Sequence, residues 1–221
     1  MTAILVILTI LLAVAVDVAL VALRRRRAAP PQPALQPMAE PRVPPAVFLA
    51  PSHAWAHLAT DGTVRLGADD FLCQLVGTVE AVKAPPPGTR VARGEPLFTL
   101  CVGSKEVAVP APFPGEVVAV NPLVVDKPYL AGRDPYGVGW IVSLWTRDLT
   151  QALQSLHIGA QATGFLRREM ERLHEFLTQR WTPHQAAVLA DGGMPLRGCL
   201  QSLDEASFAD FCRTFIQRQE V

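Results

Sequence analysis

The first apolar run of the chain predicts a membrane anchor. Residues 3–23 are almost all apolar, and such a run is long enough to cross the ~30 Å hydrocarbon core of a bilayer as a helix. Only Met1 and Thr2 precede the run, whereas residues 24–27 are all arginine. A cleaved signal peptide would carry its positive charge before the run and a small-residue cleavage site after it. We therefore predict that residues 1–27 form an uncleaved single-pass anchor of the inner membrane. Because positive charge stays cytoplasmic, the N-terminus lies outside and the soluble part in the cytoplasm.

Asp17 interrupts this apolar run. A carboxylate near the centre of a bilayer costs about 2.5–3.5 kcal/mol on insertion scales, so acidic residues in spanning segments usually have a partner. Asp17 is therefore the candidate contact with a partner transmembrane helix. The alternative is that Asp17 is close enough to the lipid headgroups to stay hydrated, or that it is protonated.

The next segment, residues 28–45, predicts a linker. It is rich in Pro and Ala, with few charges and no apolar periodicity. Such a composition favours extended, polyproline-like conformations and makes a semi-rigid spacer.

Between residues 46 and 147, short apolar runs alternate with turn signals, which is typical of a small all-β domain. The predicted strands cover residues 63–66, 76–82, 97–102, 107–109, 117–120 and 140–145. Residues 68–75 predict a short helix, and Gly103-Ser104 predicts a tight turn. We expect the large aromatic residues in the core, namely Trp55, Phe71, Trp140 and Trp145.

Residues 148–221 predict a helical C-terminal extension. Helices are expected at residues 149–157, 163–181 and 202–217, the last beginning with a capping box of Ser202 and Glu205. The last helix carries one apolar stripe, formed by Phe208, Phe211, Cys212, Phe215 and Ile216. The stripe is expected to pack against the long helix or the β domain, and the alternative is docking to a partner subunit.

Composition excludes several classes of function. The formal net charge is zero and no basic patch is interleaved with aromatic residues, so we predict no nucleic-acid partner. The four cysteines form no CxxC pair, which argues against a zinc or thioredoxin-type site and suits a reducing compartment. His53 is interpreted as a packed surface residue. Without a nucleophile–base pair, paired carboxylates or a phosphate-binding loop, we predict no enzyme, no metal site and no small-molecule substrate.

Six short motifs resemble one known family. They are HAW (residues 53–55), DGTVRLG (61–67), PGT (87–89), GEP (94–96), PGEVVAVN (114–121) and DPYGVGW (134–140). In this order and spacing they resemble the H protein of the glycine cleavage system, which carries a lipoyl group between partner enzymes. The resemblance implies two small sheets folded over each other. The predicted fold class is therefore a mainly β barrel-sandwich hybrid with an N-terminal transmembrane helix and a C-terminal α-helical extension.

The lysine that carries the lipoyl arm in this family is displaced here. Family carriers place Glu-Ser-Val-Lys-Ala at a hairpin tip, and the same five places read Cys-Val-Gly-Ser-Lys at residues 101–105. Ser104 therefore occupies the lysine position, and serine cannot form an amide with lipoate. Lys105 follows one place later, and a shift of one residue along a strand turns a side chain to the opposite face. Lipoylation of Lys105 would require the turn to move by one residue, which Gly103 permits.

Three functions remain open. The first, which we favour, is a non-lipoylated, degenerate carrier without a cofactor that serves as a scaffold or accessory subunit of a membrane complex. The second is a lipoyl carrier in glycine decarboxylation or a related lipoate-dependent transfer, with the arm on Lys105. The third, a periplasmic adaptor of an efflux pump, is weaker because it needs the opposite topology and a long coiled-coil hairpin that the sequence lacks.

Overall fold

The computed structural model describes residues 36–180, 189–190 and 194–217. The predicted anchor at residues 1–27, Asp17 within it and the first part of the predicted linker lie outside these residues, so they stay predictions. None of the helices within the described residues is long and apolar enough to span a bilayer.

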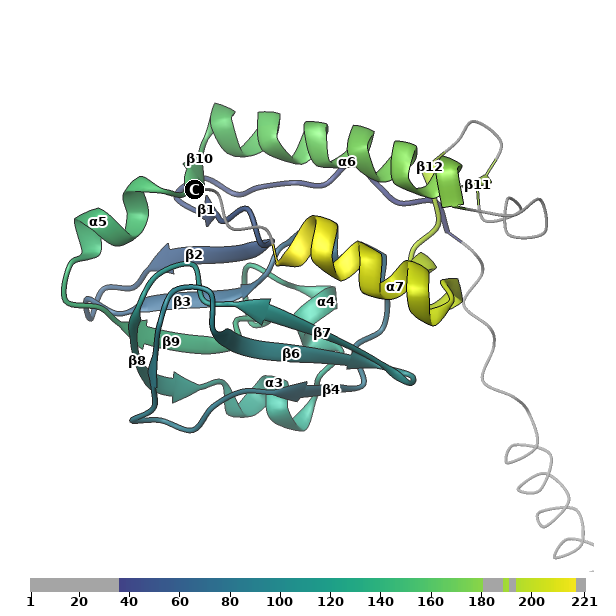
Figure 1. Ribbon diagram of the computed structural model, residues 1–221. Coiled ribbons are helices and arrows are strands. Elements are labelled where there is room, and N and C mark those ends of the chain that lie inside the picture. The colour runs from purple at the N-terminus through teal and green to yellow at the C-terminus, as the bar shows by residue number, and fades with distance from the viewer. Residues whose placement is uncertain (1–35, 181–188, 191–193, 218–221) are drawn as a thin grey trace, which may run out of the picture. The chain divides into compact units, whose positions relative to one another are not determined.

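Two antiparallel sheets form the β domain (Figure 1). The larger sheet has seven strands in the order β10-β1-β2-β3-β9-β8-β5, and the smaller has the order β4-β6-β7. The strands of the two sheets are β1 (Phe48–Leu49), β2 (Ala54–Leu58), β3 (Val64–Ala68), β4 (Ala81–Lys83), β5 (Arg90–Val91), β6 (Pro96–Val102), β7 (Lys105–Pro110), β8 (Gly115–Val120), β9 (Val142–Trp145) and β10 (His157–Ile158). A separate pair joins β11 (Leu189–Ala190) to β12 (Met194–Pro195). This architecture confirms the β part of the predicted fold.

The core lies on the inner faces of these sheets. Along β7, Val107 and Val109 are buried, whereas Glu106 and Ala108 are exposed. Because side chains of a strand alternate between its faces, this period of two divides each strand into a core face and a solvent face.

Helices cover the ends and one side of the β domain (Figure 1). They are α2 (Asp70–Val76), α3 (Pro122–Asp126), α4 (Leu130–Arg133), α5 (Leu149–Gln154), α6 (Ala160–Arg180) and α7 (Glu205–Phe211), with a 3₁₀ turn η2 (Cys199–Ser202) and a π-helical turn η3 (Cys212–Ile216). The helices predicted at residues 68–75 and 163–181 are confirmed as α2 and α6. The helix predicted at residues 149–157 is confirmed as α5 only through Gln154, because His157 already pairs with β1 as part of β10. The helix predicted at residues 202–217 is confirmed as α7 continued by η3.

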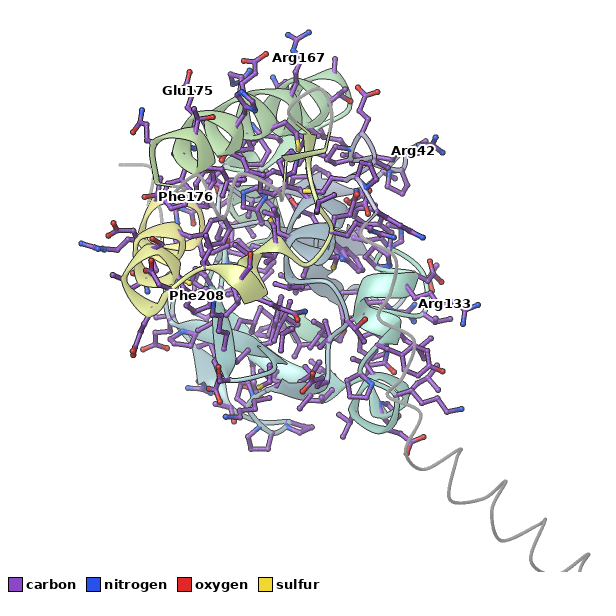
Figure 2. The ribbon with its side chains drawn as sticks, turned by 90° about the vertical axis from the view of Figure 1, so that its right-hand side faces the viewer. Arg42, Arg133, Arg167, Glu175, Phe176 and Phe208 are labelled. Carbon is purple, nitrogen blue, oxygen red and sulfur yellow. The ribbon has the colours of Figure 1, made fainter. Side chains whose placement is uncertain are left out.

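The C-terminal helices pack on the β domain through the predicted apolar stripe. Phe211 and Phe215 are fully buried, and their rings lie 6.2 Å and 5.7 Å from the ring of Phe176 on α6. Phe215 also lies 6.4 Å from Phe71 on α2. Figure 2 shows Phe176 between α6 and α7, and Phe208 on the side of α7 that faces the strands. Packing of the stripe against both the long helix and the β domain is therefore confirmed.

The end of the predicted linker is packed rather than free. Met38 is buried, and the backbone N–H groups of Ala39 and Arg42 donate to the side chains of Gln74 and Asp70 on α2. From residue 37 onward the chain is thus part of the same compact unit as the β domain.

The strand predicted at residues 76–82 is wrong over its first half. α2 continues through Val76 and ends at Gly77, whose positive φ of 77° lets its N–H return to the carbonyl of Cys73. Only the last part of the predicted segment pairs with β6, as β4.

Two further predictions need correction. Asp204, not Ser202, caps α7: its carboxylate accepts a hydrogen bond from the backbone of Ser207 at 2.8 Å, whereas the Ser202 hydroxyl donates to the carbonyl of Cys199 within η2. Trp145 is not in the core, since it is 51% exposed. Leu144 points inward, so the next residue of β9 must point outward. Trp55 and Phe71 are buried as predicted, and Trp140 is half-buried.

Candidate functional site

The site is the tip of the β6–β7 hairpin. Val102 pairs with Lys105, which leaves Gly103 and Ser104 as a two-residue turn. Gly103 has a φ of 58°, as the first central residue of such tight hairpins often requires. Ser104, which the sequence resemblance aligns with the family's lysine, is thus at the exposed end of the hairpin, and Lys105 is already the first residue of a strand.

Lys105 points to the inner face of the hairpin. It shares that face with Val107 and Val109, because alternate residues of a strand lie on one side. On that face Lys105 meets residues 196–217, which we call the C-terminal cover (Figure 1).

The ammonium group of Lys105 is held by backbone carbonyls of the C-terminal cover. Its Nζ donates to the carbonyl oxygen of Leu200 at 2.6 Å, to that of Gln201 at 3.3 Å and to that of Leu203. It also lies 5.1 Å from the ring centroid of Phe208, within reach of a cation–π interaction. These carbonyls are at the end of η2, where a cation is favourable, and the Leu200 carbonyl also accepts from the backbone N–H of Leu203 at 3.4 Å.

The C-terminal cover is fixed to α2 next to the hairpin. Gly198 donates its N–H to the carbonyl of Gln74 at 2.8 Å, and the Gln201 side chain donates to the carbonyl of Val76 at 3.0 Å. A Cβ at Gly77 would lie 2.9 Å from the Cα of Gly198, so the two backbones can approach this closely only because residue 77 is glycine. This contact places the carbonyls of η2 over Lys105.

The two lysines near the hairpin tip, Lys105 and Lys83, have different electrostatic surroundings. Burial lowers the pKa of Lys105 from its ordinary value, although the negative charge of Asp204 opposes this. Lys83 on β4 instead pairs with Glu106 at 2.5 Å on the exposed face. Cys101 is half-buried, and burial together with Glu106 raises the pKa of its thiol.

A second polar cluster ties α6 to the β domain. His53 is fully buried at a φ of 62°, so its interpretation as a surface residue is wrong. Its Nδ1 donates to Asp69 at 2.8 Å, and its Nε2 lies 3.7 Å from a carboxylate oxygen of Glu169 on α6, an ion-pair distance. Burial by itself would lower the pKa of His53, but Asp69 and Glu169 outweigh it and raise this pKa to about 9.

Arg172 continues this cluster to the C-terminal cover. Its guanidinium donates to both carboxylate oxygens of Glu169, at 2.5 Å and 2.8 Å, and to the carbonyl of Thr214 at 3.3 Å. It also stacks 4.9 Å from the ring centroid of Phe215. Although burial favours its neutral form, His53 and Arg172 hold the pKa of Glu169 below its ordinary value.

Sequence reasoning missed the partners of Lys105 and His53 for different reasons. The acceptors of Lys105 are backbone carbonyls, which every residue has, so no residue type in the sequence indicates them. His53 and Asp69 flank β2 and β3, whose antiparallel pairing could have placed them together. Glu169 stands on the inner side of α6 between the apolar Leu166 and Leu173, a position where a carboxylate signals a buried partner. Among the described residues, no cluster of three or more His, Cys, Asp or Glu could hold a metal ion.

Replacement of Lys105 by Met should destabilise the protein by about 1–2 kcal/mol, since charged hydrogen bonds contribute more than neutral ones but this ammonium is only partly buried. Methionine keeps most of the length and the packing on Phe208 while removing the donor. Urea denaturation measures the change. Ser104→Ala, at the exposed neighbouring position, should leave the midpoint unchanged. An equal loss in both variants would contradict the role of the Lys105 donor.

Comparisons with known proteins agree on one family. The family model described as glycine cleavage H-protein matches residues 48–169. The chain is 37% identical over 121 residues to glycine cleavage system H protein 2 of Aquifex aeolicus, which covers 55% of this chain and 75% of that protein. It is 31% identical over 128 residues to the probable H protein of Pyrococcus abyssi, covering 58% and 95%. With the H protein of Mycobacterium avium the identity is 35% over 114 residues, covering 51% and 85%.

Among solved structures, the crystal structure of the H protein from Mycobacterium marinum aligns with a TM-score of 0.48 and 25% identity, covering 57% of this chain and 98% of that one. The family match ends within α6. The C-terminal cover therefore lies beyond the matched residues.

Proposed function

Because the chain belongs to the glycine cleavage H-protein family, we propose that it is a non-lipoylated member that serves as a scaffold or accessory subunit. Members of this family carry a lipoyl group and have no catalytic site of their own. The observation that carries the proposal is the state of the hairpin tip. The exposed position holds Ser104, and the only adjacent lysine donates to the carbonyls of the C-terminal cover.

The lipoyl group does not fit this arrangement. Attachment needs a lysine Nζ that is free to form an amide and to carry a long arm. The ammonium group of Lys105 donates hydrogen bonds to the carbonyls of Leu200 and Leu203, and an amide at this position would replace it with a neutral group. The arm would then start beneath Phe208 and the end of η2, so lipoylation and docking of the C-terminal cover exclude each other.

We further propose that this subunit is tethered to the inner membrane with its β domain in the cytoplasm. The support is the apolar run at residues 3–23 and the arginines at residues 24–27. Asp17 within the run would contact a partner helix of the same complex. The relatives named above are proteins of the glycine cleavage system, so components of that system or of a related lipoate-dependent one are the first partners to test.

A second candidate function is a lipoyl carrier with its arm on Lys105. Family membership favours it, because the matched relatives are all named as H proteins. It requires the C-terminal cover to leave the hairpin before a ligase can reach Lys105.

Incubation with a lipoate–protein ligase, lipoate and ATP separates the two functions. The full chain should gain no lipoyl mass, whereas Cys101→Glu combined with Ser104→Lys should gain one lipoyl group, because this pair restores the family's glutamate and exposed lysine. Intact-mass measurement and peptide mapping across residues 94–133 provide the readout. Lys105→Ala in the restored variant tests that the new group is on residue 104. Lipoate found on Lys105 of the unaltered protein would overturn the scaffold proposal and establish the carrier.

A further inference from the structure

A trough on the opposite side of the β domain from the hairpin tip has no role in the function proposed above. It has a volume of about 570 Å³ and lies between β5, β8, the end of β9 and α5. In Figure 1 α5 and the tip of the β6–β7 hairpin lie at opposite sides of the β domain. We call this cavity the arginine trough, after Arg90, Arg93 and Arg147 in its lining.

The trough has an apolar floor and one aromatic wall. Phe113 and Ala152 line it and are buried against the core, at 2% and 5% exposure. Strand register places Arg90, Glu116 and Trp145 side by side across β5, β8 and β9. Trp145 is 51% exposed, so its ring offers apolar surface to whatever enters the trough.

The lining carries three arginines and two carboxylates, Glu116 and Asp148, so its net charge is positive. Arg90 pairs with Glu116 at 3.4 Å, and the carboxylate of Asp148 accepts from the backbone of Gln151 as the cap of α5. Within the part of the chain that the structure describes, Arg93 and Arg147 have neither an ion pair nor a side-chain hydrogen bond. Guanidinium groups beside an apolar floor are well suited to bind carboxylates.

The shape of the trough favours a segment of polypeptide as its occupant. A small-molecule site buries most of its ligand, but here the walls are open, with the Arg90 side chain 87% exposed and Trp145 half exposed. A flat bilayer surface could touch the rim but could not reach the recessed Phe113. Trp and Arg are enriched among the residues that contribute most binding energy at protein interfaces, and both types surround the recessed Phe113 here.

We propose that the arginine trough binds an acidic segment of a partner protein, with one apolar side chain of the segment on Phe113 and its carboxylates on Arg93 and Arg147. The rim arginines attract the acidic segment and fix its register, while the floor and Trp145 supply the apolar contact. This site is independent of Lys105, so it stands whether or not the hairpin carries lipoate.

Fluorescence anisotropy tests the proposal with the full chain in nanodiscs of phosphatidylcholine and a fluorescein-labelled peptide that has a central phenylalanine flanked by glutamates. The peptide should bind, and each of Arg93→Glu, Arg147→Glu and Trp145→Ala should weaken it by at least about tenfold. Binding should weaken with added salt, and the same peptide with glutamine in place of glutamate should bind poorly.

Arg167→Glu is the matched control. Arg167 projects from the outer face of α6, away from the trough, and the substitution makes the same change of charge (Figure 2). Equal affinity in all variants, or equal weakening by Arg167→Glu, would overturn the proposal. Displacement of the peptide by benzoate at a similar concentration would overturn it in favour of a small-anion site. Failure of the peptide, together with an Arg93- and Arg147-dependent change in Trp145 fluorescence on phosphatidylserine nanodiscs, would overturn it in favour of a lipid surface.

Discussion

The substitution His53→Asn should destabilise the protein by about 3–5 kcal/mol, the usual cost of removing one partner from a buried ion pair. The imidazolium of His53 lies between the carboxylates of Asp69 and Glu169, all of them buried. Without the cation, two carboxylates remain in the core with only Arg172 to offset one of them. Asparagine suits the test because it tolerates the positive φ of 62° at this position. Urea denaturation followed by tryptophan fluorescence measures the loss.

The same cluster gives stability a defined dependence on pH. The folded pKa of His53, about 9, is above the 6.5 of an unfolded histidine, so the folded state binds the extra proton between these values. This contribution is fully present below pH 6.5 and is lost as the pH rises to about 9, a decrease on the order of 3 kcal/mol. Glu169 acts oppositely: its lowered pKa gives stability above its unfolded pKa that is lost on acidification. The free energy of unfolding should therefore be greatest between the pH range in which carboxyl groups titrate and pH 6.5.

His57→Asn is the control for both measurements. His57 is exposed on β2, four residues away, so its replacement should change stability by no more than about 0.5 kcal/mol. In His53→Asn the decrease between pH 6.5 and 9 should disappear. A decrease that survives in this variant would mean that another group causes it.

The β domain could be predicted from sequence because its signals are local. Turn residues such as Gly94 and Gly103 interrupt alternating apolar strands, and the six motifs fix their order. The errors arise where local signals compete. Val76 and Val79 read as a strand, but Gly77 between them ends a helix. The size of Trp145 predicts a core position, but Leu144 points inward, so the next residue of the strand points to the solvent.

The candidate site was predictable only in part, because its decisive contacts join segments far apart in the chain. From the sequence come Ser104 and Lys105 at the predicted hairpin turn, and the structure has Lys105 as the first residue of β7. The carbonyl of Leu200, by contrast, is 95 residues from Lys105 and carries no side-chain signature. Glu169 is similarly distant from His53 in the sequence. The sequence alone therefore could not distinguish a buried, protonated His53 with a carboxylate partner from a packed, neutral one.

The substitution Phe215→Ala should release the C-terminal cover and destabilise the protein by about 3–5 kcal/mol, as removal of a fully buried phenylalanine usually does. Phe215 stacks 4.9 Å from Phe211, meets Phe176 of α6 and Phe71 of α2, and supports Arg172. Its ring thus joins the C-terminal cover to both α6 and α2. Tyr129→Ala, which removes an aromatic ring that is 43% exposed, should cost far less.

Hydrogen exchange distinguishes release of the C-terminal cover from a local packing defect. Amides of residues 196–217 and of the hairpin at residues 102–107 should lose protection together in Phe215→Ala, because Lys105 links them through the carbonyls of Leu200 and Leu203. Combining Phe215→Ala with Lys105→Met should then cost less than the sum of the single changes, since the first already breaks the contacts that the second removes. Strict additivity, with faster exchange only in η3, would show that Lys105 is not coupled to the C-terminal cover. Lys105 would then be an accessible lysine that a ligase could modify.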